Sequence, residues 1–293
     1  MILGELLERV YRATHTNLVN GIATGGTATT IVDSGLITKP FTENKFKDYI
    51  VFITRTTDGL TPQGKYGIAT AYVKSTGTIT IPTVTDAVQV GDRYSLCKPD
   101  VPLYTMEDLC NDGLRYLGGV DAWDTSLITA AATLRYTLPI AAKGLRLRSL
   151  YLRNPSNTFI TCEAPNYDVE NSVGGSQPTL VFKSQPLSNM TIVFNYIGDH
   201  PTLTAYNSYV NEKIYDQLAI AACIEQYYGW RVVQKQKPLD QKNWNFAKAK
   251  LEEAKRAYPI ETPTVENKRV PIGLFNGNAR RRDYNPDPLG RYP

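Results

Sequence analysis

The fold is decided by residues 209–258, YVNEKIYDQLAIAACIEQYYGWRVVQKQKPLDQKNWNFAKAKLEEAKRAY, which predict two consecutive helices. In the first helix, apolar residues recur at steps of three and four and therefore share one face. They are Val210, Ile214, Leu218, Ala221, Ile224 and Tyr228. Tyr215, Ala219, Ala222 and Cys223 add a second apolar strip. A helix that is apolar nearly all round is typically covered on more than one side, so we expect this helix to be enclosed.

The second helix has a narrower apolar stripe. Its members are Trp244, Ala247, Leu251, Ala254 and Tyr258, and charged residues cover the other sides. Asp240 is the predicted N-cap, Pro259 ends the helix, and Gly229 with the polar run 234–237 marks the turn between the two helices. Neither helix carries catalytic chemistry, so we interpret both as scaffold. The residues of these two helices that we expect to form the core and the subunit contacts are Ile214, Leu218, Ala221, Ile224, Trp244 and Leu251.

The composition describes an ordinary folded chain with room for more than one domain. Its 293 residues are 42% hydrophobic and 20% charged. The net charge of +4 is too small to indicate nucleic-acid binding by the whole molecule. The 19 tyrosines, against 8 phenylalanines, favour hydrated contacts between partners. No apolar run is long enough to span a bilayer, the N-terminus does not read as a signal peptide, and the widely spaced cysteines are expected to be free thiols.

Upstream of the opening stretch, helical and strand-like segments come in blocks. Residues 2–13 and 104–117 predict helices, the second beginning with a capping box formed by Thr105 and Asp108. The first β-rich section, 27–98, has expected strands at 29–32, 49–54, 67–73, 78–81 and 93–96. The second, 125–200, has expected strands at 133–138, 145–152, 159–162, 179–182 and 190–196. Along 145–152 the apolar alternation slips at Ser149.

This order predicts an α+β fold. Residues 1–16, 104–119 and 209–258 form a small helical bundle, into which two antiparallel sandwich-like or barrel-like β-sections are inserted. Helices and strands do not alternate singly, which argues against a doubly wound parallel sheet.

Residues 259–293 form an extended C-terminal tail that cannot bury enough surface to fold alone. The tail is either disordered or laid along a neighbouring subunit. Its apolar content favours docking on a partner through Ile272, Leu274, Phe275, Tyr284, Leu289 and Tyr292. Arg280, Arg281 and Arg282 form a cluster that contacts phosphate or, as the commoner interpretation, solvent or a partner.

Candidate catalytic and metal-binding residues are few and poorly spaced. His15 and His200 stand apart from any ligand cluster, and the pair Asp108 and Asp112 is typical of a solvated helix face. The Gly-rich segment 24–27 follows a helix and precedes a strand, the reverse of a phosphate loop, so it is expected to be a plain loop. The loop 166–171 lacks the calcium-loop pattern. We therefore expect no enzyme activity, no metal and no cofactor.

The order of parts resembles the head-to-tail connector, or adaptor, proteins of tailed bacteriophages. The resemblance is carried by the opening MILGELL, by the Tyr/Ala-rich helix followed by a helix spanning Trp244 and Leu251, and by the Pro-rich tail. The section 27–96, closing with GDRY at 91–94, is similar to domains inserted in structural proteins of such virions.

The resemblance implies a structural virion protein, made in the host cytoplasm and located in the phage neck. It would assemble as a homo-oligomeric ring, commonly a dodecamer, beneath the portal protein and above a tail or nozzle protein. The helices would surround a channel through which genomic DNA passes without sequence-specific contact, and no membrane is involved. The alternative is a tail- or fibre-associated protein that uses its β-rich sections to contact glycan or another tail protein. A cell-wall hydrolase is a third possibility, which would need a pair of acidic residues in a cleft.

Overall fold

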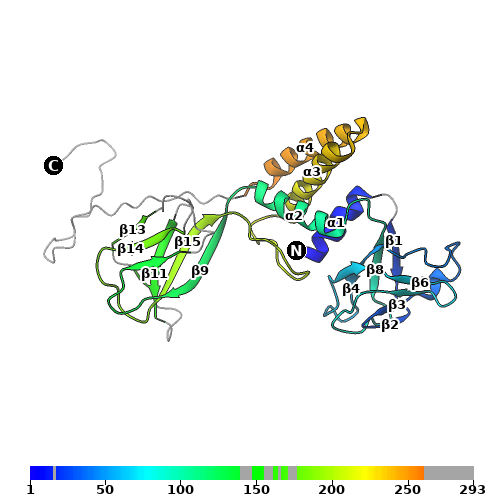
Figure 1. Cartoon of the computed structure of the whole chain (residues 1–293), viewed down its shortest axis with the longest axis horizontal. Coiled ribbons are helices and arrows are strands. Elements are labelled where there is room, and N and C mark those ends of the chain that lie inside the picture. Colours follow the sequence, from blue (N-terminus) through cyan, green and yellow to red (C-terminus); the bar gives the residue numbers. More distant parts are fainter. Residues whose placement is uncertain (16–17, 139–146, 155–160, 164–165, 171–176, 261–293) are drawn as a thin grey trace. The chain divides into compact units, whose positions relative to one another are not determined.

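The computed structural model describes residues 1–15, 18–138, 147–154, 161–163, 166–170 and 177–260. The protein is an α+β chain, and its described residues form four α-helices, one short 3₁₀ helix at Ser34–Leu36 and four antiparallel sheets (Figure 1). The α+β class expected from the sequence is confirmed.

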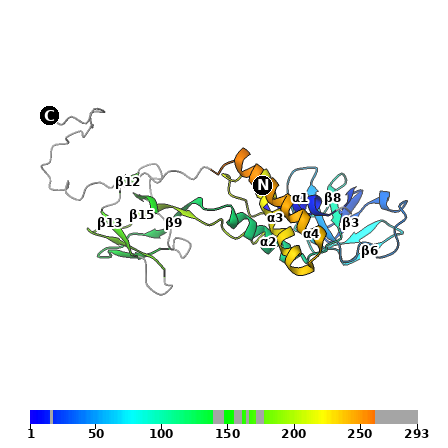
Figure 2. The same ribbon diagram turned by 90° about the horizontal axis from the view of Figure 1, so that it is seen from above.

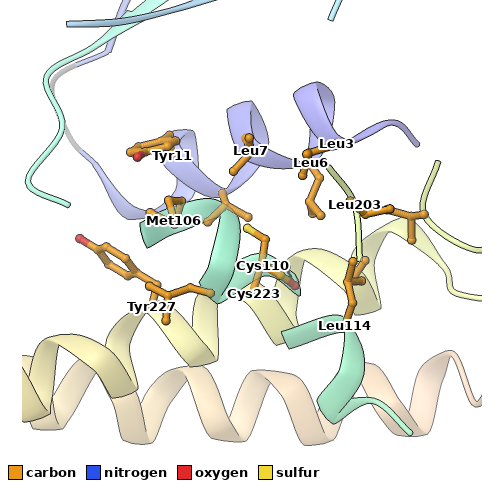
Figure 3. Close-up of a cluster of buried hydrophobic side chains, with 14 of the residues drawn as sticks. Leu3, Leu6, Leu7, Tyr11, Met106, Cys110, Leu114, Leu203, Cys223 and Tyr227 are labelled. Carbon is orange, nitrogen blue, oxygen red and sulfur yellow. Dashed lines mark hydrogen bonds between the residues drawn. The ribbon is translucent and has the colours of Figure 1, made fainter. Parts of the chain in front are cut away.

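The four helices pack around α3. They are α1 (Leu3–Thr14), α2 (Leu103–Tyr116), α3 (Asp216–Lys235) and α4 (Pro238–Ala257). Helices α1, α2 and α4 all contact α3, and α3 lies beside α4 in both views (Figures 1 and 2). The core between α1, α2 and α3 includes Leu3, Leu6, Leu7, Tyr11, Met106, Cys110, Leu114, Leu203, Cys223 and Tyr227 (Figure 3). The expected enclosure of α3 is confirmed, and the chain's own helices provide it.

The start of α3 differs from the prediction. The helix begins at Asp216 rather than at 210, because the segment before it runs beside the N-terminus instead of coiling. Ile2 and Tyr209 form an antiparallel bridge, and the backbone N–H of Val210 donates to the carbonyl of Met1 at 3.0 Å. Val210 and Ile214 are nevertheless buried, so their apolar spacing reflects packing of this segment rather than helix.

The turn between α3 and α4 also differs. Gly229 lies inside α3, and the helix ends at Lys235, with Gln236 as its C-cap in a left-handed conformation (φ 48°). A Cβ on Gly229 would lie 3.1 Å from the indole nitrogen of Trp244, so close packing of α4 explains this glycine. Asp240 is not the N-cap of α4, because Lys237 holds that position and Pro238 begins the helix.

Two sheets form the first β-section. One has the order β1-β8-β4-β5, with β1 (Leu18–Ile22), β4 (Ile50–Arg55), β5 (Tyr66–Ile68) and β8 (Arg93–Cys97). The other has the order β2-β3-β7-β6, with β2 (Gly25–Thr27), β3 (Thr30–Val32), β6 (Ala71–Val73) and β7 (Thr78–Thr80). Their shared core contains Ile31, Phe46, Tyr72, Ile79 and Tyr94.

Three expectations for this section need correction. The expected strand 67–73 is two strands in different sheets, joined through the buried Ala69. Strand β1 was not expected, and Gly25 and Gly26 belong to strand β2 rather than to a plain loop. Strand β1 pairs with the distant β8, and β2 contains two glycines, so local periodicity detects neither strand.

Helix α2 begins earlier than the capping-box prediction requires. Its N-cap is Pro102, which makes no side-chain capping bond, so Thr105 and Asp108 lie inside the helix. The expected apolar face, with Met106, Leu109, Cys110 and Leu114, is buried.

The second β-section also has two sheets around one core. The order β12-β11-β15-β9 joins β9 (Val120–Ile128), β11 (Leu147–Arg153), β12 (Thr161–Glu163) and β15 (Thr191–Gly198). The order β10-β14-β13 joins β10 (Arg135–Thr137), β13 (Tyr167–Glu170) and β14 (Thr179–Phe182). The predicted slip at Ser149 is confirmed by a register shift between Leu147 and Ser149. Strand β9 begins before the expected boundary at 125, and β13, at Tyr167–Glu170, lies within the segment expected to be a loop.

Candidate interaction surfaces

The scaffold residues predicted on α3 and α4 fall into two groups. Leu218 and Leu251 are 1% and 2% exposed and meet in a small cluster with Ala222 between the two helices. Ala221 lies half-buried beside that cluster. These residues therefore stabilise the packing of α3 against α4 within one subunit. Their contact with a second subunit stays a prediction.

Ile214 and Ile224 belong to the larger core with α1 and α2, where Ile214 is buried and Ile224 half-buried. Trp244 on α4 is half-buried at the contact with α3. Its indole N–H donates to Glu225 Oε1 at 2.7 Å, and Lys248 Nζ lies 3.4 Å from the ring centroid. A hydrogen bond and a cation–π contact therefore fix this side chain to its own chain.

Helix α4 carries an apolar stripe that faces solvent. Leu239 and Phe246, which we call the α4 stripe, are each 66% exposed. They are two helical turns apart and so lie on the same face. Exposed Lys242 and Lys250 lie on the same helix, with Lys250 Nζ 6.0 Å from the Phe246 ring centroid. Exposed apolar side chains bordered by charge are typical of protein contacts.

An ionic network centred on Asp100 joins separate parts of the bundle. Its carboxylate lies 2.5 Å from His15 Nε2 and 2.6 Å from Arg231 Nη1, and it accepts hydrogen bonds from the Tyr227 hydroxyl at 3.1 Å. Lys235 Nζ is 3.7 Å away. The network connects the end of α1, the segment before α2, and α3.

Arg231 extends the network to α4. Its Nε lies 3.0 Å from Oδ1 of Asp240, which is 1% exposed in the first turn of α4. Burial alone raises the pKa of Asp100, but the hydrogen bond from His15 and the charges of His15 and Arg231 outweigh it and hold the pKa below its usual range. These groups act as a structural clamp on the helices, which agrees with the ordinary role expected of His15.

Replacing Asp100 with Asn is expected to lower the free energy of unfolding by about 1 kcal/mol at pH 7, since partial exposure screens the ion pairs. The lowered pKa means that the carboxylate stabilises the fold above the pKa of an ordinary Asp, about 3.9, and loses this effect as the pH falls. Urea unfolding at pH 7 and at acidic pH checks this, because the two proteins should converge in acid.

Asp112→Asn is the matched control. Asp112 pairs with Arg115 at 3.4 Å on an exposed helix surface, so its loss should change the free energy of unfolding by less than about 0.5 kcal/mol. Equal effects from the two variants would contradict the clamp.

The other candidate residues, the carboxylates and His200, do not form a catalytic or metal site with other residues that the structure describes. Asp108 and Asp112 are both exposed, and Asp168 on β13 pairs with Lys183 at 3.0 Å. His200 is buried, with Nδ1 2.7 Å from the Pro201 carbonyl and Nε2 accepting from the Asn211 N–H, and burial lowers its pKa.

Metal-ligand and membrane features are also absent from the part of the chain that the structure describes. It contains no group of three or more His, Cys, Asp or Glu residues arranged to hold a metal ion. Cys97, Cys110 and Cys223 are buried free thiols. None of its helices combines the length and apolar character needed to cross a bilayer.

The tail predictions lie outside the described residues. These are the docking residues Ile272, Leu274, Phe275, Tyr284, Leu289 and Tyr292, and the cluster Arg280, Arg281 and Arg282. Their assignments stay predictions.

Two further surfaces were missed by sequence reasoning. Trp123 on β9, 60% exposed, pairs with Asn195 on β15, and Tyr151 on β11, 36% exposed, pairs with Val193. Val193 and Asn195 are two apart on β15 and therefore share a face of the sheet. Directly paired residues also share a face, so the rings of Trp123 and Tyr151 lie on the same side. The second surface contains Arg12, Arg55 and Arg93 around a hollow beside α1. In the sequence, these residues stand apart as single aromatic or basic residues, which carry no signal for a shared surface.

No protein-family model matches the sequence, and a search of curated proteins finds no match.

Proposed function

We propose that this chain is a structural virion protein, a ring-forming head-to-tail adaptor that joins the portal to the tail of a bacteriophage and surrounds the DNA channel. The observation that carries the proposal is the α4 stripe, in which Leu239 and Phe246 are exposed on a helix of the bundle. The enclosure of α3 no longer supports assembly, because α1, α2 and α4 of the same chain cover it. The case for a neighbouring copy therefore rests on α4.

Ring assembly requires a heterologous interface, in which one patch meets a different patch on the next copy. Exposed tyrosines on α2 and before α3 are the candidates for this second surface. Those that are strongly exposed are Tyr104, Tyr116, Tyr209 and Tyr215, at 74%, 61%, 74% and 56%. Aromatic rings with a hydroxyl suit the hydrated part of an interface.

The other proposed partners follow from the resemblance. The tail 259–293 would reach the portal or an adjacent subunit, and a tail or nozzle protein would bind on the opposite side of the ring. Genomic DNA would pass through without sequence-specific contact. The deciding observation is whether the purified protein forms rings in electron micrographs and has the mass of an oligomer in solution.

Replacing Leu239 and Phe246 together with Glu is expected to abolish rings while leaving the subunit folded. Two unpaired carboxylates at an interface should weaken association by about 3 kcal/mol, roughly a hundredfold. Light scattering across a concentration series measures the change, and circular dichroism checks the fold.

The control variant is Leu60→Glu with Leu187→Glu, which makes the same change at two leucines that are each 67% exposed elsewhere. It should assemble as the unaltered protein does. Loss of assembly in both variants would point to nonspecific charge repulsion rather than to the α4 stripe.

A second candidate is a tail- or fibre-associated protein that binds glycan, and the exposed rings of Trp123 and Tyr151 on one sheet face favour it. Aromatic faces pack against sugar rings and leave polar groups hydrated. The same measurement of mass in solution distinguishes the two functions, because a glycan-binding protein does not need to form a ring.

A further inference from the structure

A β-bulge places two arginines side by side on one sheet. Ile53 on β4 pairs with Tyr94 on β8, but the next pair is Arg55 with Arg93, so Thr54 is an extra residue on β4. Without this bulge, Thr54 would stand opposite Arg93 and Arg55 would point to the other face, since side chains alternate along a strand. The bulge therefore turns Arg55 onto the face that carries Arg93.

The same face continues under α1. Phe52 and Ser95 form the next pair on this face, and Phe52 is part of the core that includes α1. The Ser95 hydroxyl donates to Glu8 Oε1 at 3.2 Å, and Arg12 Nε donates to the same oxygen at 3.0 Å. Arg12 on α1 thus lies over the sheet face from which Arg93 and Arg55 project.

Arg12, Arg55 and Arg93 line a hollow of about 520 Å³, which we call the arginine hollow. Its other lining residues are Asn20, Gly21, Ile22, Thr54, Tyr94 and Ser95, and none of these is a carboxylate. Glu8 is buried and held by Arg12 and Ser95, so it neutralises Arg12 alone.

The charges of Arg55 and Arg93 are unbalanced. Both residues are exposed, and neither forms an ion pair with any residue that the structure describes. Like charges directly opposite each other on paired strands destabilise a sheet. A bulge that creates such a pair therefore works against stability, which is typical of a binding site rather than of a structural contact.

We propose that the arginine hollow binds the phosphate backbone of double-stranded DNA, with Arg55 and Arg93 each contacting a phosphate and no base being recognised. Guanidinium groups fork onto phosphate oxygens with two parallel hydrogen bonds. Two neighbouring guanidinium groups suit a polyanion that presents one phosphate to each of them, and the hollow is open at the sheet surface. The inference does not depend on ring formation, so either proposal can fail alone.

The test measures DNA binding by the full chain against the variant Arg55→Gln with Arg93→Gln. Binding of a labelled duplex is followed by fluorescence anisotropy over a series of salt concentrations. Each phosphate contact contributes about 0.9 to the slope of log affinity against log salt, so the variant should lose about 2 from this slope. The loss should be the same for duplexes of different sequence.

Lys45→Gln with Lys47→Gln is the matched control. It removes the same charge from exposed lysines of the same β-section, and it should leave the slope within about 0.5 of the unaltered protein. The melting temperature of the arginine variant shows whether a loss of binding is caused by unfolding. Removing the repulsion between Arg55 and Arg93 should leave this temperature unchanged or raised.

Three outcomes would overturn the proposal. The unaltered protein could fail to bind duplex DNA at low salt. The control could lose as much of the slope as the arginine variant, which would indicate net charge alone. Finally, the arginine variant could keep DNA binding but lose self-association, in which case the hollow faces a carboxylate-bearing surface of a second copy.

Discussion

Leu218→Asp is expected to unfold the helical bundle or reduce its free energy of unfolding by about 4 kcal/mol or more. Leu218 is 1% exposed and meets Leu251 and Ala222 where α3 and α4 pack together. The new carboxylate would be buried among these apolar side chains, which cannot pair with it. Urea unfolding followed by circular dichroism measures the effect.

The control is the same change at Leu239, which is 66% exposed in the first turn of α4. A carboxylate near a helix N-terminus is favourable, so Leu239→Asp should change stability by less than about 0.5 kcal/mol. If Leu218→Asp were as stable as Leu239→Asp, the packing of α3 against α4 would be wrong.

Gly4→Ala is expected to destabilise the protein by about 2 to 3 kcal/mol through overpacking. Helix propensity alone predicts the opposite, since Ala is favoured over Gly by about 1 kcal/mol inside a helix. A Cβ on Gly4 would lie 1.8 Å from the carbonyl oxygen of Gly64, which is a backbone atom and cannot rotate away. Either α1 or the loop at Gly64 would have to shift.

Backbone hydrogen bonds of both Gly4 and Gly64 oppose this shift. The Gly4 N–H donates to the Tyr206 carbonyl at 3.0 Å, and the Gly64 N–H donates to the Ile53 carbonyl at 2.8 Å. Gly25→Ala is the control, because a Cβ there meets nothing within 4 Å, and it should be nearly neutral. Thermal unfolding of both variants checks the contrast, and a stabilised Gly4→Ala protein would show that α1 does not approach this loop so closely.

Residue spacing was sufficient to predict the helical bundle because its pattern is local. The apolar stripe with Ala247 and Leu251 and the face with Met106 and Cys110 are both buried as expected. Helix ends were less predictable. Val210 and Ile214 continue the apolar spacing of α3, but pairing of this segment with the N-terminus, through Ile2 and Tyr209, replaces the helix.

Strand β1 and the missed surfaces depend on distant partners. Leu18 on β1 pairs with Cys97, and nothing in the sequence near Leu18 indicates that partner. The clamp around Asp100 collects single polar residues from separate segments, and the arginine hollow requires a bulge at Thr54. Neither a bulge nor a long-range ion pair leaves a periodic signal.

The strand pair β4–β8 belongs to two apolar interiors at once. Ile50, Phe52 and Cys97 are part of the core with the helices, whereas Val51, Ile53 and Leu96 are part of the core of the first β-section. This section therefore could not be excised at its two connections and keep its stability, because removal would expose one side of a central sheet to water. The helices would lose part of their interior in the same step, so these two parts of the chain should unfold as one unit.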